Sequence, residues 1–181
     1  MLFRSIREGL DDANIELGLE RGEAPDAMGT GYRFSHLMAI APNASSSIIM
    51  GNTSPSIEPY RANAYRQDTL SGSSLNKNKW LDKIIKETAN NEDEYNEIWS
   101  SIIANDGSVQ HLDILDDVQK DVFKTSMEID QRWVIDLAAD RQEFIDQAQS
   151  LNVFFRPDAN IKYLHAIHFR SEEHTSELQS H

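Results

Sequence analysis

Residues His36 to Met50 read HLMAIAPNASSSIIM, and this stretch is the clearest indication of the fold class. Its first half is apolar from Leu37 to Ala41, has the length of a short strand and ends at Pro42. By pattern alone, so short a run fits either a strand or a buried helical segment. The glycines and prolines that bound it favour a buried strand, followed by a turn or a helix at the serines.

A helix is predicted on the N-terminal side of this strand. The segment Ser5 to Arg21 is followed by Gly22 and Pro25, which are typical of a helix end. Its apolar residues recur at spacings of four, three and four, on one stripe of a helix: Ile6, Leu10, Ala13 and Leu17. The GTG of residues 29–31 lacks the third glycine of a dinucleotide fingerprint, so we interpret it as a flexible connection. A helix, a short buried strand and another turn are the order of elements in an α/β fold.

More helices are predicted after the serines. The segment Tyr60 to Gly72 fits a short extended pair or an irregular segment. Trp80, Ile84 and Ile85 form the apolar face of one helix. A second helix, which Gly107 ends, has a longer apolar face: Tyr95, Ile98, Trp99, Ile102 and Ile103.

The longest periodic segment runs from Val118 to Gln149 and predicts a long helix, whose start Asp116 or Asp117 would cap. Its apolar positions at helical spacing are Val122, Ile129, Trp133 and Leu137, continued by Phe144, Ile145 and Ala148. The run LNVFF, residues 151–155, is typical of a second short strand. Pro157 then precedes a small helix through NIKYLHAIHF.

Composition limits the classes of function. The 181 residues are enough for one ordinary domain and carry a net charge of −13, with no cluster of Lys and Arg. A protein that binds DNA or RNA normally presents a basic face, so we expect no nucleic-acid partner. No apolar run approaches the ~18 residues of a membrane span, so we expect no membrane partner. The absence of cysteine excludes disulfides and thiol chemistry by this chain, and fits a cytoplasmic location.

The segment from Pro42 to Ser47 is the candidate site. N–H groups at a junction between a strand and a helix point outward together, and serine hydroxyls beside them can donate to phosphate oxygens. The alternative is that Asn43 or Ser45 only caps a helix or a turn. The residues by themselves therefore indicate an α/β piece with a candidate phosphate loop.

Other candidate groups have ordinary interpretations beside the functional ones. Arg33, Arg61 and Arg66 are the basic residues near the serines in the sequence, and each could reach an anion or pair with an acid. His165 and His168 are three residues apart on a predicted helix, but no Asp, Glu or Cys lies at a matching spacing within that helix. We therefore predict no metal site and no catalytic residue in this chain.

Several blocks resemble the large catalytic subunit of class I ribonucleotide reductases, in its C-terminal barrel region. The longest is residues 36–72, HLMAIAPNASSSIIMGNTSPSIEPYRANAYRQDTLSG. It is followed in the same order by DRQEFIDQAQSLNVFF, residues 140–155, and LHAIHF, residues 164–169. RGEAPD, residues 21–26, resembles the segment just upstream, so the likeness runs from Met1 to Phe169.

This resemblance implies a fold and a substrate. The family folds as a ten-stranded α/β barrel, so the chain would be a helix-rich fragment of that barrel. The family reduces ribonucleoside diphosphates to deoxyribonucleoside diphosphates for DNA synthesis. Its Pro-x-Ala-Ser-Ser/Thr loop binds the diphosphate of the substrate, and the matching residues here are Pro42, Asn43, Ala44, Ser45 and Ser46.

The chain departs from the family pattern because it has no cysteine. In the family, a cysteine thiyl radical abstracts a hydrogen from the ribose, and a cysteine pair supplies the reducing electrons. The asparagine and glutamate that assist the radical, and the effector-binding region, would lie upstream of Met1. The tyrosine pair that relays the radical would lie past Phe169. We therefore expect an internal fragment that is inactive alone, with Met1 an internal methionine or an assigned start.

The last twelve residues differ in kind from the rest. RSEEHTSELQSH, Arg170 to His181, matches the translation of a common sequencing adapter. We therefore predict that residues 1–169 are an incomplete C-terminal part of the reductase barrel domain. Residues 170–181 are predicted to be a non-native tail.

The resemblance also implies partners for the intact enzyme. These are a small subunit with a radical-generating metallocofactor, a second large subunit as dimer partner, ATP and dATP as allosteric effectors, and a thioredoxin-type reductant. We expect no cofactor in this chain itself. The alternative function is a free-standing acidic helical module that binds a protein through the faces of Trp80, Trp99 and Trp133.

Overall fold

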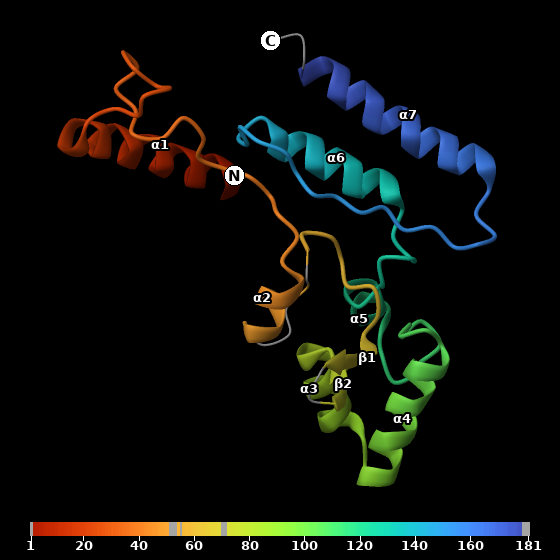
Figure 1. Ribbon diagram of the computed structural model, residues 1–181. Coiled ribbons are helices and arrows are strands. Elements are labelled where there is room, and N and C mark those ends of the chain that lie inside the picture. Colours follow the sequence, from red (N-terminus) through yellow and green to blue (C-terminus); the bar gives the residue numbers. More distant parts are fainter. Residues whose placement is uncertain (1, 51–53, 55, 70–71, 179–181) are drawn as a thin grey trace. The chain divides into compact units, whose positions relative to one another are not determined.

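The computed structural model describes residues 2–50, 54, 56–69 and 72–178 (Figure 1). The elements follow in the order α1 (Leu2–Arg21), α2 (Ala44–Ile49), β1 (Ala64–Thr69), β2 (Gly72–Lys77), α3 (Lys79–Thr88), α4 (Glu92–Ala104), α5 (Asp117–Val122), α6 (Gln131–Gln142) and α7 (Ile161–Leu178). In this described part, the structure is rich in helices and has one two-stranded sheet. Within the described helices, none combines the length and the apolar character needed to cross a bilayer.

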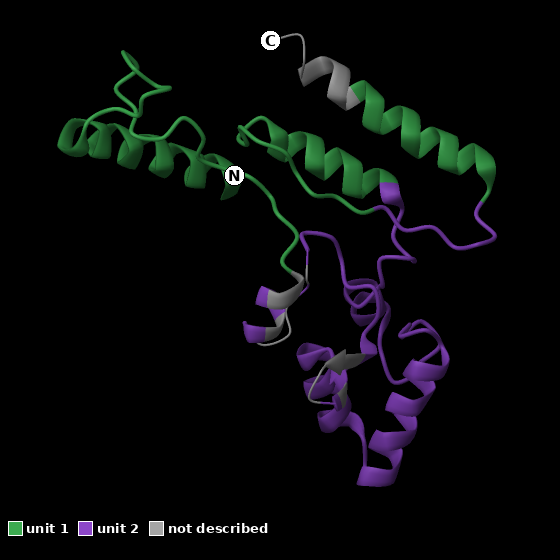
Figure 2. Cartoon of the chain, in the orientation of Figure 1, with its two compact units in different colours: residues 1–43, 132–152, 160–181 green, residues 44–131, 153–159 purple. Residues whose placement is uncertain are grey.

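The chain divides into two compact units (Figure 2). Unit 1 consists of residues 1–43, 132–152 and 160–181, and includes α1, most of α6 and α7. Unit 2 consists of residues 44–131 and 153–159, and includes α2, the hairpin of β1 and β2, and helices α3 to α5. Each unit combines segments that are distant in the sequence, so each depends on long-range contacts.

Helix α1 of unit 1 confirms the predicted helix, but its most buried face is not the predicted stripe. Asn14 and Gly18 are buried, and Arg7 and Asp11 are half-buried on the same side of the helix. These four residues repeat the spacings of the predicted stripe one position later along the chain. Ile6, in the predicted stripe, is 41% exposed. Two other members of the predicted stripe, Leu10 and Leu17, are half-buried, so the prediction of the face was wrong in part. The most buried side of α1 packs against backbone and polar groups, which the periodicity of apolar residues does not report.

The loop after α1 packs closely on this small and polar face. The Asn14 Nδ2 donates to the carbonyl of Phe34 at 2.9 Å, and the Asn14 Oδ1 accepts from the N–H of Phe34 at 2.7 Å. A Cβ atom at Gly18 would lie 2.0 Å from the carbonyl oxygen of Gly31. The absence of a side chain at Gly18 therefore allows the loop backbone to approach the helix.

Residues 29–31 are not the flexible connection that the sequence suggested. The Glu23 carboxylate accepts hydrogen bonds from the N–H of Gly29 at 2.7 Å and of Gly31 at 2.5 Å. These backbone hydrogen bonds lower the pKa of Glu23 below its usual range. Gly29 and Gly31 have φ angles of 85° and 79°, which suit glycine and wrap the backbone around the carboxylate. The connection therefore has a defined structure.

The predicted strand at residues 37–41 is extended and pairs in parallel with residues 147–150. The Ile40 N–H donates to the carbonyl of Ala148 at 3.2 Å, and the Ile40 carbonyl accepts from the N–H of Ser150 at 2.7 Å. Its side chains are exposed or half-buried. The extended conformation is thus confirmed. The expected burial is wrong, because the described pairing covers one edge of the segment and leaves its side chains exposed or half-buried.

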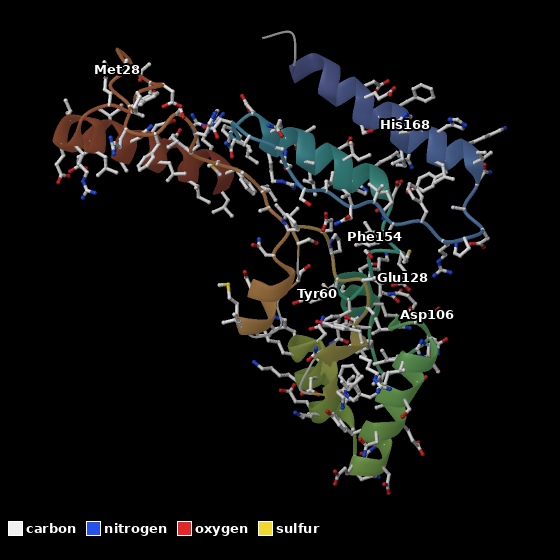
Figure 3. The ribbon with its side chains drawn as sticks, viewed as in Figure 1. Met28, Tyr60, Asp106, Glu128, Phe154 and His168 are labelled. Carbon is white, nitrogen blue, oxygen red and sulfur yellow. The ribbon has the colours of Figure 1, made fainter. Side chains whose placement is uncertain are left out.

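The long helix predicted for residues 118–149 is wrong. The segment forms two helices, α5 and α6, with a loop between them. The loop is held by distant groups: the Ser126 N–H donates to the carbonyl of Tyr60 at 2.8 Å, and the Ser108 Oγ donates to Glu128 at 2.5 Å. Figure 3 labels Tyr60 and Glu128. These tertiary hydrogen bonds replace the helical hydrogen bonds that the loop does not make. The prediction was wrong because the apolar residues keep their helical spacing through the loop, and this spacing does not reveal the tertiary contacts.

The predicted cap of this segment is confirmed. Asp116 is the N-cap of α5, and its side chain accepts from the N–H of Gln119 at 2.7 Å. The Gln119 side chain accepts in turn from the N–H of Asp116 at 3.0 Å. The two residues thus form a capping box, which satisfies N–H groups that a helix start leaves free.

Helix α6 buries a different face from the one predicted. Trp133 and Leu137, two members of the predicted stripe, are 64% and 52% exposed. The buried apolar residues of α6 are Val134, Ile135 and Ala138. The sequence therefore predicted helical structure at residues 131–142, as part of a longer helix that does not form, and placed the apolar stripe on the wrong side.

The C-terminal part of the chain contains one confirmed helix and one wrong strand. Residues 151–155 form no strand; within unit 2, the N–H of Phe154 donates to the Gln131 side chain at 2.8 Å instead. The predicted helix after Pro157 is α7, which continues through Arg170 to Leu178. A buried glutamine thus satisfies a backbone group that the apolar pattern assigns to a sheet.

Unit 2 has an apolar core beside its hairpin. Strands β1 and β2 are antiparallel, with Ala64 opposite Lys77 and Thr69 opposite Gly72, which confirms an extended pair that ends later than predicted. The core consists of Ala64, Leu81, Ile85, Ile98, Trp99, Ile102, Val109, Leu112, Leu115 and Phe123. Trp80, predicted on the apolar face of α3, is instead 57% exposed.

A buried asparagine connects the hairpin to the rest of unit 2. The Asn63 Nδ2 donates to the carbonyls of Gly107 at 3.1 Å and of Phe123 at 2.7 Å. The Asn63 Oδ1 accepts from the Nδ2 of Asn78, the residue that caps α3, at 3.0 Å. One side chain therefore bonds three segments that are distant in sequence.

Candidate functional site

The candidate loop, residues 42–46, joins the extended segment to α2. Pro42 and Asn43 are exposed at the end of the extended segment, and α2 begins at Ala44. The sequence predicted an extended segment followed by a turn or a helix at the serines, and the structure has the helix. Pro42 and Asn43 belong to unit 1, whereas Ala44 to Ser46 belong to unit 2.

Two polar groups of this loop differ in what they offer to a ligand. The Asn43 Nδ2 donates to the carbonyl of Ala41, two residues before it, at 3.0 Å. A helix or turn cap by Asn43, the alternative interpretation, stays a prediction. Ser46 is exposed on α2. A hydroxyl in this position is accessible to a solute, whereas part of the Asn43 amide is already used within the chain.

The other serines complete the description of the loop. Ser47 is buried and has an interaction within the protein. The side chains of Ala44 and Ser45 lie outside the described residues. The assignment of residues 42–46 to a phosphate site therefore stays a prediction.

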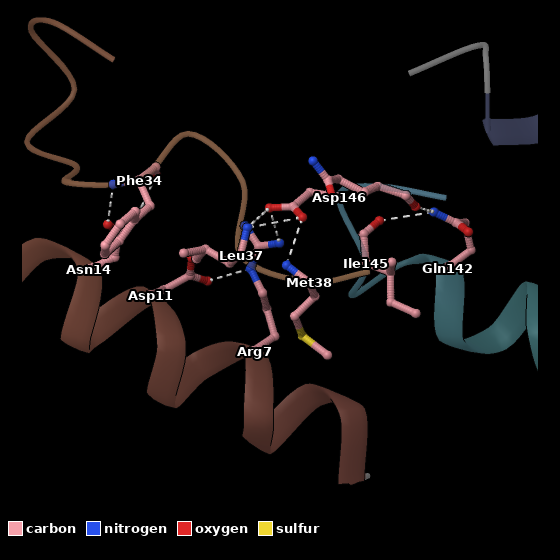
Figure 4. Close-up of polar contacts among 10 residues, drawn as sticks. Arg7, Asp11, Asn14, Phe34, Leu37, Met38, Gln142, Ile145 and Asp146 are labelled. Carbon is pink, nitrogen blue, oxygen red and sulfur yellow. Dashed lines mark hydrogen bonds and ion pairs between the residues drawn. The ribbon is translucent and has the colours of Figure 1, made fainter. Parts of the chain in front are cut away.

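A carboxylate outside the predicted loop holds the segment that leads into it (Figure 4). The Asp146 Oδ2 accepts from the N–H of Leu37 at 2.9 Å, and its Oδ1 accepts from the N–H of Met38 at 2.9 Å. The Arg7 Nη1 donates to the Asp146 Oδ2 at 3.1 Å, while the Arg7 Nε donates to Asp11 at 3.0 Å. One carboxylate thus joins α1, the extended segment and the turn after α6.

The environment of Asp146 keeps it charged. Burial by itself would raise the pKa of Asp146, but the N–H groups of Met38 and Leu37 and the charge of Arg7 together lower it. The contact with Asp11 and then that with Asp146 raise the pKa of Arg7. At neutral pH the carboxylate is therefore an acceptor of hydrogen bonds and not a source of protons.

Glutamines fix the turn that carries Asp146. The Gln142 Nε2 donates to the carbonyl of Ile145 at 2.9 Å (Figure 4). The Gln149 Nε2 donates to the carbonyl of Ala138 and to the Gln142 Oε1, both at 2.8 Å. The turn is thereby bonded to α6 on both sides of Asp146, which limits the movement of its carboxylate.

The basic residues near the loop in sequence have different surroundings. The Arg33 Nη1 donates to the carbonyl of Gly22 at 3.4 Å, beside the end of α1. Arg61 and Arg66 are exposed in unit 2. A contact of any of them with a bound anion stays a prediction.

The two histidines on α7 have the surroundings of surface residues (Figure 3). His168 is exposed, with its Nε2 3.2 Å from Glu172, and the His165 ring stacks on Phe169 at 6.2 Å between centroids. Among the residues that the structure describes, no three or more His, Cys, Asp or Glu side chains are grouped to hold a metal ion. We assign these histidines no role in a site.

Comparison with known proteins identifies the family. The family model that describes the barrel domain of ribonucleotide reductase matches residues 23–175. The chain belongs to the ribonucleotide reductase family. Membership confirms the fold class inferred from the sequence, a helix-rich part of the reductase α/β barrel.

Relatives of this ribonucleotide reductase chain carry the name of the large subunit. It is 55% identical over 172 residues to the ribonucleoside-diphosphate reductase large subunit of Invertebrate iridescent virus 6, covering 94% of this chain and 18% of that protein. It is 54% identical over 173 residues to the one of Invertebrate iridescent virus 3, covering 96% of this chain and 28% of that protein. The chain thus spans less than a third of the length of these two relatives.

A solved structure extends the likeness to three dimensions. The class Id ribonucleotide reductase alpha subunit of Actinobacillus ureae is 41% identical to this chain, with a TM-score of 0.84. The match covers 96% of this chain and 31% of the solved chain. The arrangement of this reductase chain therefore recurs in an alpha subunit of the family.

Sequence reasoning about this reductase chain missed Asp146 and Arg7. Asp146 lies in DRQEFIDQAQSLNVFF, one of the blocks that carried the resemblance, so a signal was present. The sequence of this block does not indicate which of its acids accepts hydrogen bonds from backbone N–H groups. Those groups belong to Leu37 and Met38, which are more than a hundred positions away. Arg7 lies beside the predicted apolar stripe of α1, where periodicity gives no reason to single out a charged residue.

Proposed function

We propose that this chain is part of a ribonucleoside-diphosphate reductase large subunit and supplies the loop that binds the diphosphate of the substrate. The residues of the loop are Pro42, Asn43, Ala44, Ser45 and Ser46. The observation that carries the proposal is that Pro42, Asn43 and Ser46 are exposed where an extended segment meets α2, in a chain whose relatives are named for this reductase. The whole protein would convert ribonucleoside diphosphates to deoxyribonucleoside diphosphates.

The chemistry of the loop suits an anion. Hydroxyl and backbone N–H groups donate hydrogen bonds to phosphate oxygens without a positive charge. In a chain with a net charge of −13, such neutral donors provide affinity for a diphosphate where basic side chains are scarce. Ser46, which is exposed, is the described hydroxyl of the loop that a ligand can reach.

The chain itself holds the substrate and does not transform it. It has no cysteine, so the thiyl radical and the reducing pair must come from elsewhere in the intact enzyme. We assign the radical-generating metallocofactor to a separate small subunit, and the reducing electrons to a thioredoxin-type protein. A second large subunit, ATP and dATP as effectors, and a cytoplasmic location belong to the same proposal.

Titration calorimetry with ADP tests the loop. We expect ADP and inorganic pyrophosphate to bind the purified chain and adenosine to bind much more weakly, because the loop recognises the diphosphate. Ser46→Ala should weaken ADP binding by roughly 10- to 150-fold, since a hydrogen bond to a charged group contributes roughly 1.5–3 kcal/mol. No deoxyribonucleotide should appear when the chain is incubated with a ribonucleoside diphosphate and a reductant.

The matched control is Ser100→Ala. Ser100 is exposed on α4, and its Oγ donates to the carbonyl of Asn96 at 2.8 Å. This variant should bind ADP as the unaltered chain does. Equal losses in Ser46→Ala and Ser100→Ala, or binding of adenosine as tight as that of ADP, would contradict the loop assignment.

The alternative of a free-standing module that binds a protein is less well supported. Trp99 is 2% exposed and lies in the core of unit 2, so it cannot form a docking face. Trp80 and Trp133 are 57% and 64% exposed. Their exposure is equally expected for part of a larger barrel, and membership of the reductase family favours that explanation.

The boundary at residue 169 is a separate proposal. We propose that residues 1–169 belong to the barrel domain and that residues 170–181 are a non-native tail. No helix ends at this boundary, because α7 continues across it and the Arg170 Nε lies 2.8 Å from the Asp136 Oδ1. The proposal therefore rests on the sequence of the tail. The nucleotide sequence tests the tail: the codons of the sequencing adapter support it, and any other codons for these residues contradict it.

A further inference from the structure

We propose that Asp146 is the residue that positions the entry into the diphosphate loop. This inference rests on the proposed function of residues 42–46. Asp146 is a positioning residue, because its carboxylate contacts the backbone of Leu37 and Met38 and reaches a ligand only through them. The segment that it controls, residues 37–43, lies with Asp146 in unit 1.

The first argument is the number of contacts made by a single carboxylate. Its two oxygens accept from two consecutive N–H groups, and one of them also accepts from Arg7. Hydrogen bonds to an ionised acceptor are about twice as strong as neutral ones. Leu37 and Met38 therefore cannot slide along the neighbouring segment without losing charge-assisted bonds.

The second argument is the register that these contacts set. Directly after Asp146, the N–H of Gln147 donates to the carbonyl of Met38 at 3.2 Å, which begins the parallel pairing that continues at Ile40. A slip by one residue moves an extended chain by about 3.3 Å and turns each side chain to the opposite face. Pro42 and Asn43 follow within a few residues, so the slip would displace the start of the loop.

The third argument concerns charge. An unpaired carboxylate would repel an anionic ligand, whereas Asp146 is paired with Arg7 and has a side chain only 21% exposed. Arg7 also pairs with Asp11, so α1 supplies a cation that is itself held in place. The pairing lets an acid anchor the segment that leads into a proposed anion site.

The test uses Asp146→Asn in the full chain, with Asp140→Asn as the matched control. Asparagine keeps the shape and one acceptor oxygen but loses the charge and the second acceptor. Asp140 is exposed on α6, so its variant makes the same change in net charge at a site without this role. Nuclear magnetic resonance measures the amide exchange of Leu37 and Met38 and the amide shifts of residues 43–46. Calorimetry measures ADP affinity.

We expect Asp146→Asn to accelerate amide exchange at Leu37 and Met38 at least tenfold, to shift the amide signals of residues 43–46, and to weaken ADP binding at least tenfold. Asp140→Asn should change none of these. The thermal midpoint distinguishes a positioning role from a general loss of stability. The affinity of Asp146→Asn for ADP should be weaker even at temperatures at which this variant is still folded. Should Asp146→Asn fail to fold, Asp146→Glu keeps the charge and moves the carboxylate by one methylene, and it should show the same changes in exchange and affinity.

The outcomes distinguish this inference from the proposed function. If the unaltered chain binds no ADP or pyrophosphate, the diphosphate function fails, and the positioning role is then decided by the amide shifts of residues 43–46 in Asp146→Asn. Unchanged shifts and exchange in that variant overturn the role, even when ADP binds the unaltered chain. Shifted loop amides with unaltered ADP affinity overturn it as well.

Discussion

Single polar side chains connect segments of this protein that no regular sheet joins. Asn14 bonds both backbone groups of Phe34, and Gln131 accepts from the N–H of Phe154. Asn63 is 2% exposed and bonds three other segments of unit 2. A buried side-chain amide both donates and accepts, so it can replace a missing backbone partner. Removal of such a side chain should lower the free energy of unfolding by more than the net contribution of its hydrogen bonds, because the buried partners are left unsatisfied.

Asn63→Ala is the prediction at this scale. The substitution leaves the Phe123 carbonyl and the Asn78 Nδ2 without this partner in a buried site, and each unsatisfied group costs roughly 1–3 kcal/mol. We expect the free energy of unfolding of unit 2 to fall by about 3 kcal/mol. Urea denaturation followed by the fluorescence of Trp99, which lies in the same core, measures the change.

The control for this prediction is Asn96→Ala. Asn96 is exposed on α4, and surface substitutions usually change stability by no more than about 0.5 kcal/mol. Similar midpoints for Asn63→Ala and the unaltered chain would show that Asn63 is not a connecting residue.

At the scale of elements, α1 shows that a helix can pack through its small and polar residues. Its buried residues are Asn14 and Gly18, and the loop backbone at Gly31 lies where a side chain on Gly18 would be. The same helix contains Gly9, where an added Cβ atom would have no neighbour within 4 Å. One glycine therefore permits a close contact, whereas the other makes none.

Gly18→Ala and Gly9→Ala should have effects of opposite sign. Alanine at position 18 would collide with the Gly31 carbonyl, and such overpacking typically costs about 1–3 kcal/mol. Alanine at position 9 meets no neighbour and should stabilise the helix by roughly 0.5–1 kcal/mol. Thermal unfolding followed by circular dichroism measures both, and stabilisation by Gly18→Ala would contradict the close approach of the loop to α1.

At the scale of the whole molecule, the chain exposes large apolar side chains while spanning less than a third of the length of the relatives from Invertebrate iridescent viruses 6 and 3. Trp133 and Leu137 are one turn apart on α6 and are both more than half exposed. Exposed apolar patches favour association, because contact with another surface removes them from water. The unaltered chain should therefore associate with itself at micromolar concentration.

The double substitution Trp133→Lys and Leu137→Lys should reduce this association. Light scattering after size-exclusion chromatography should show a smaller mean mass for this variant than for the unaltered chain. The control, Asn96→Lys with Ser100→Lys, adds the same charge to an exposed face of α4. Equal masses for the variant and the control would show that charge, and not the apolar face of α6, governs association.

Local patterns were sufficient for part of this structure. The apolar run closed by Pro42 and followed by serines predicted an extended segment and then a turn or a helix, and the structure has an extended segment followed by α2. Asp116 predicted a helix start, and the family likeness predicted the barrel class. These inferences succeed because the signals are local in the sequence. Helix and strand breakers and helix caps act on neighbouring residues, and the family likeness is read from contiguous blocks. The phosphate assignment of residues 42–46 comes from the same kind of evidence and awaits its binding experiment.

The sequence by itself therefore determined the family, most helices and the junction at residues 42–46. Only the tertiary structure decided which face of α1 and α6 is buried and where the long periodic segment breaks. It also decided that Asp146 holds the N–H groups of Leu37 and Met38, more than a hundred positions away. The physical reason is that burial and hydrogen-bond partners depend on what the folded chain brings alongside, and no local spacing of residues contains that information.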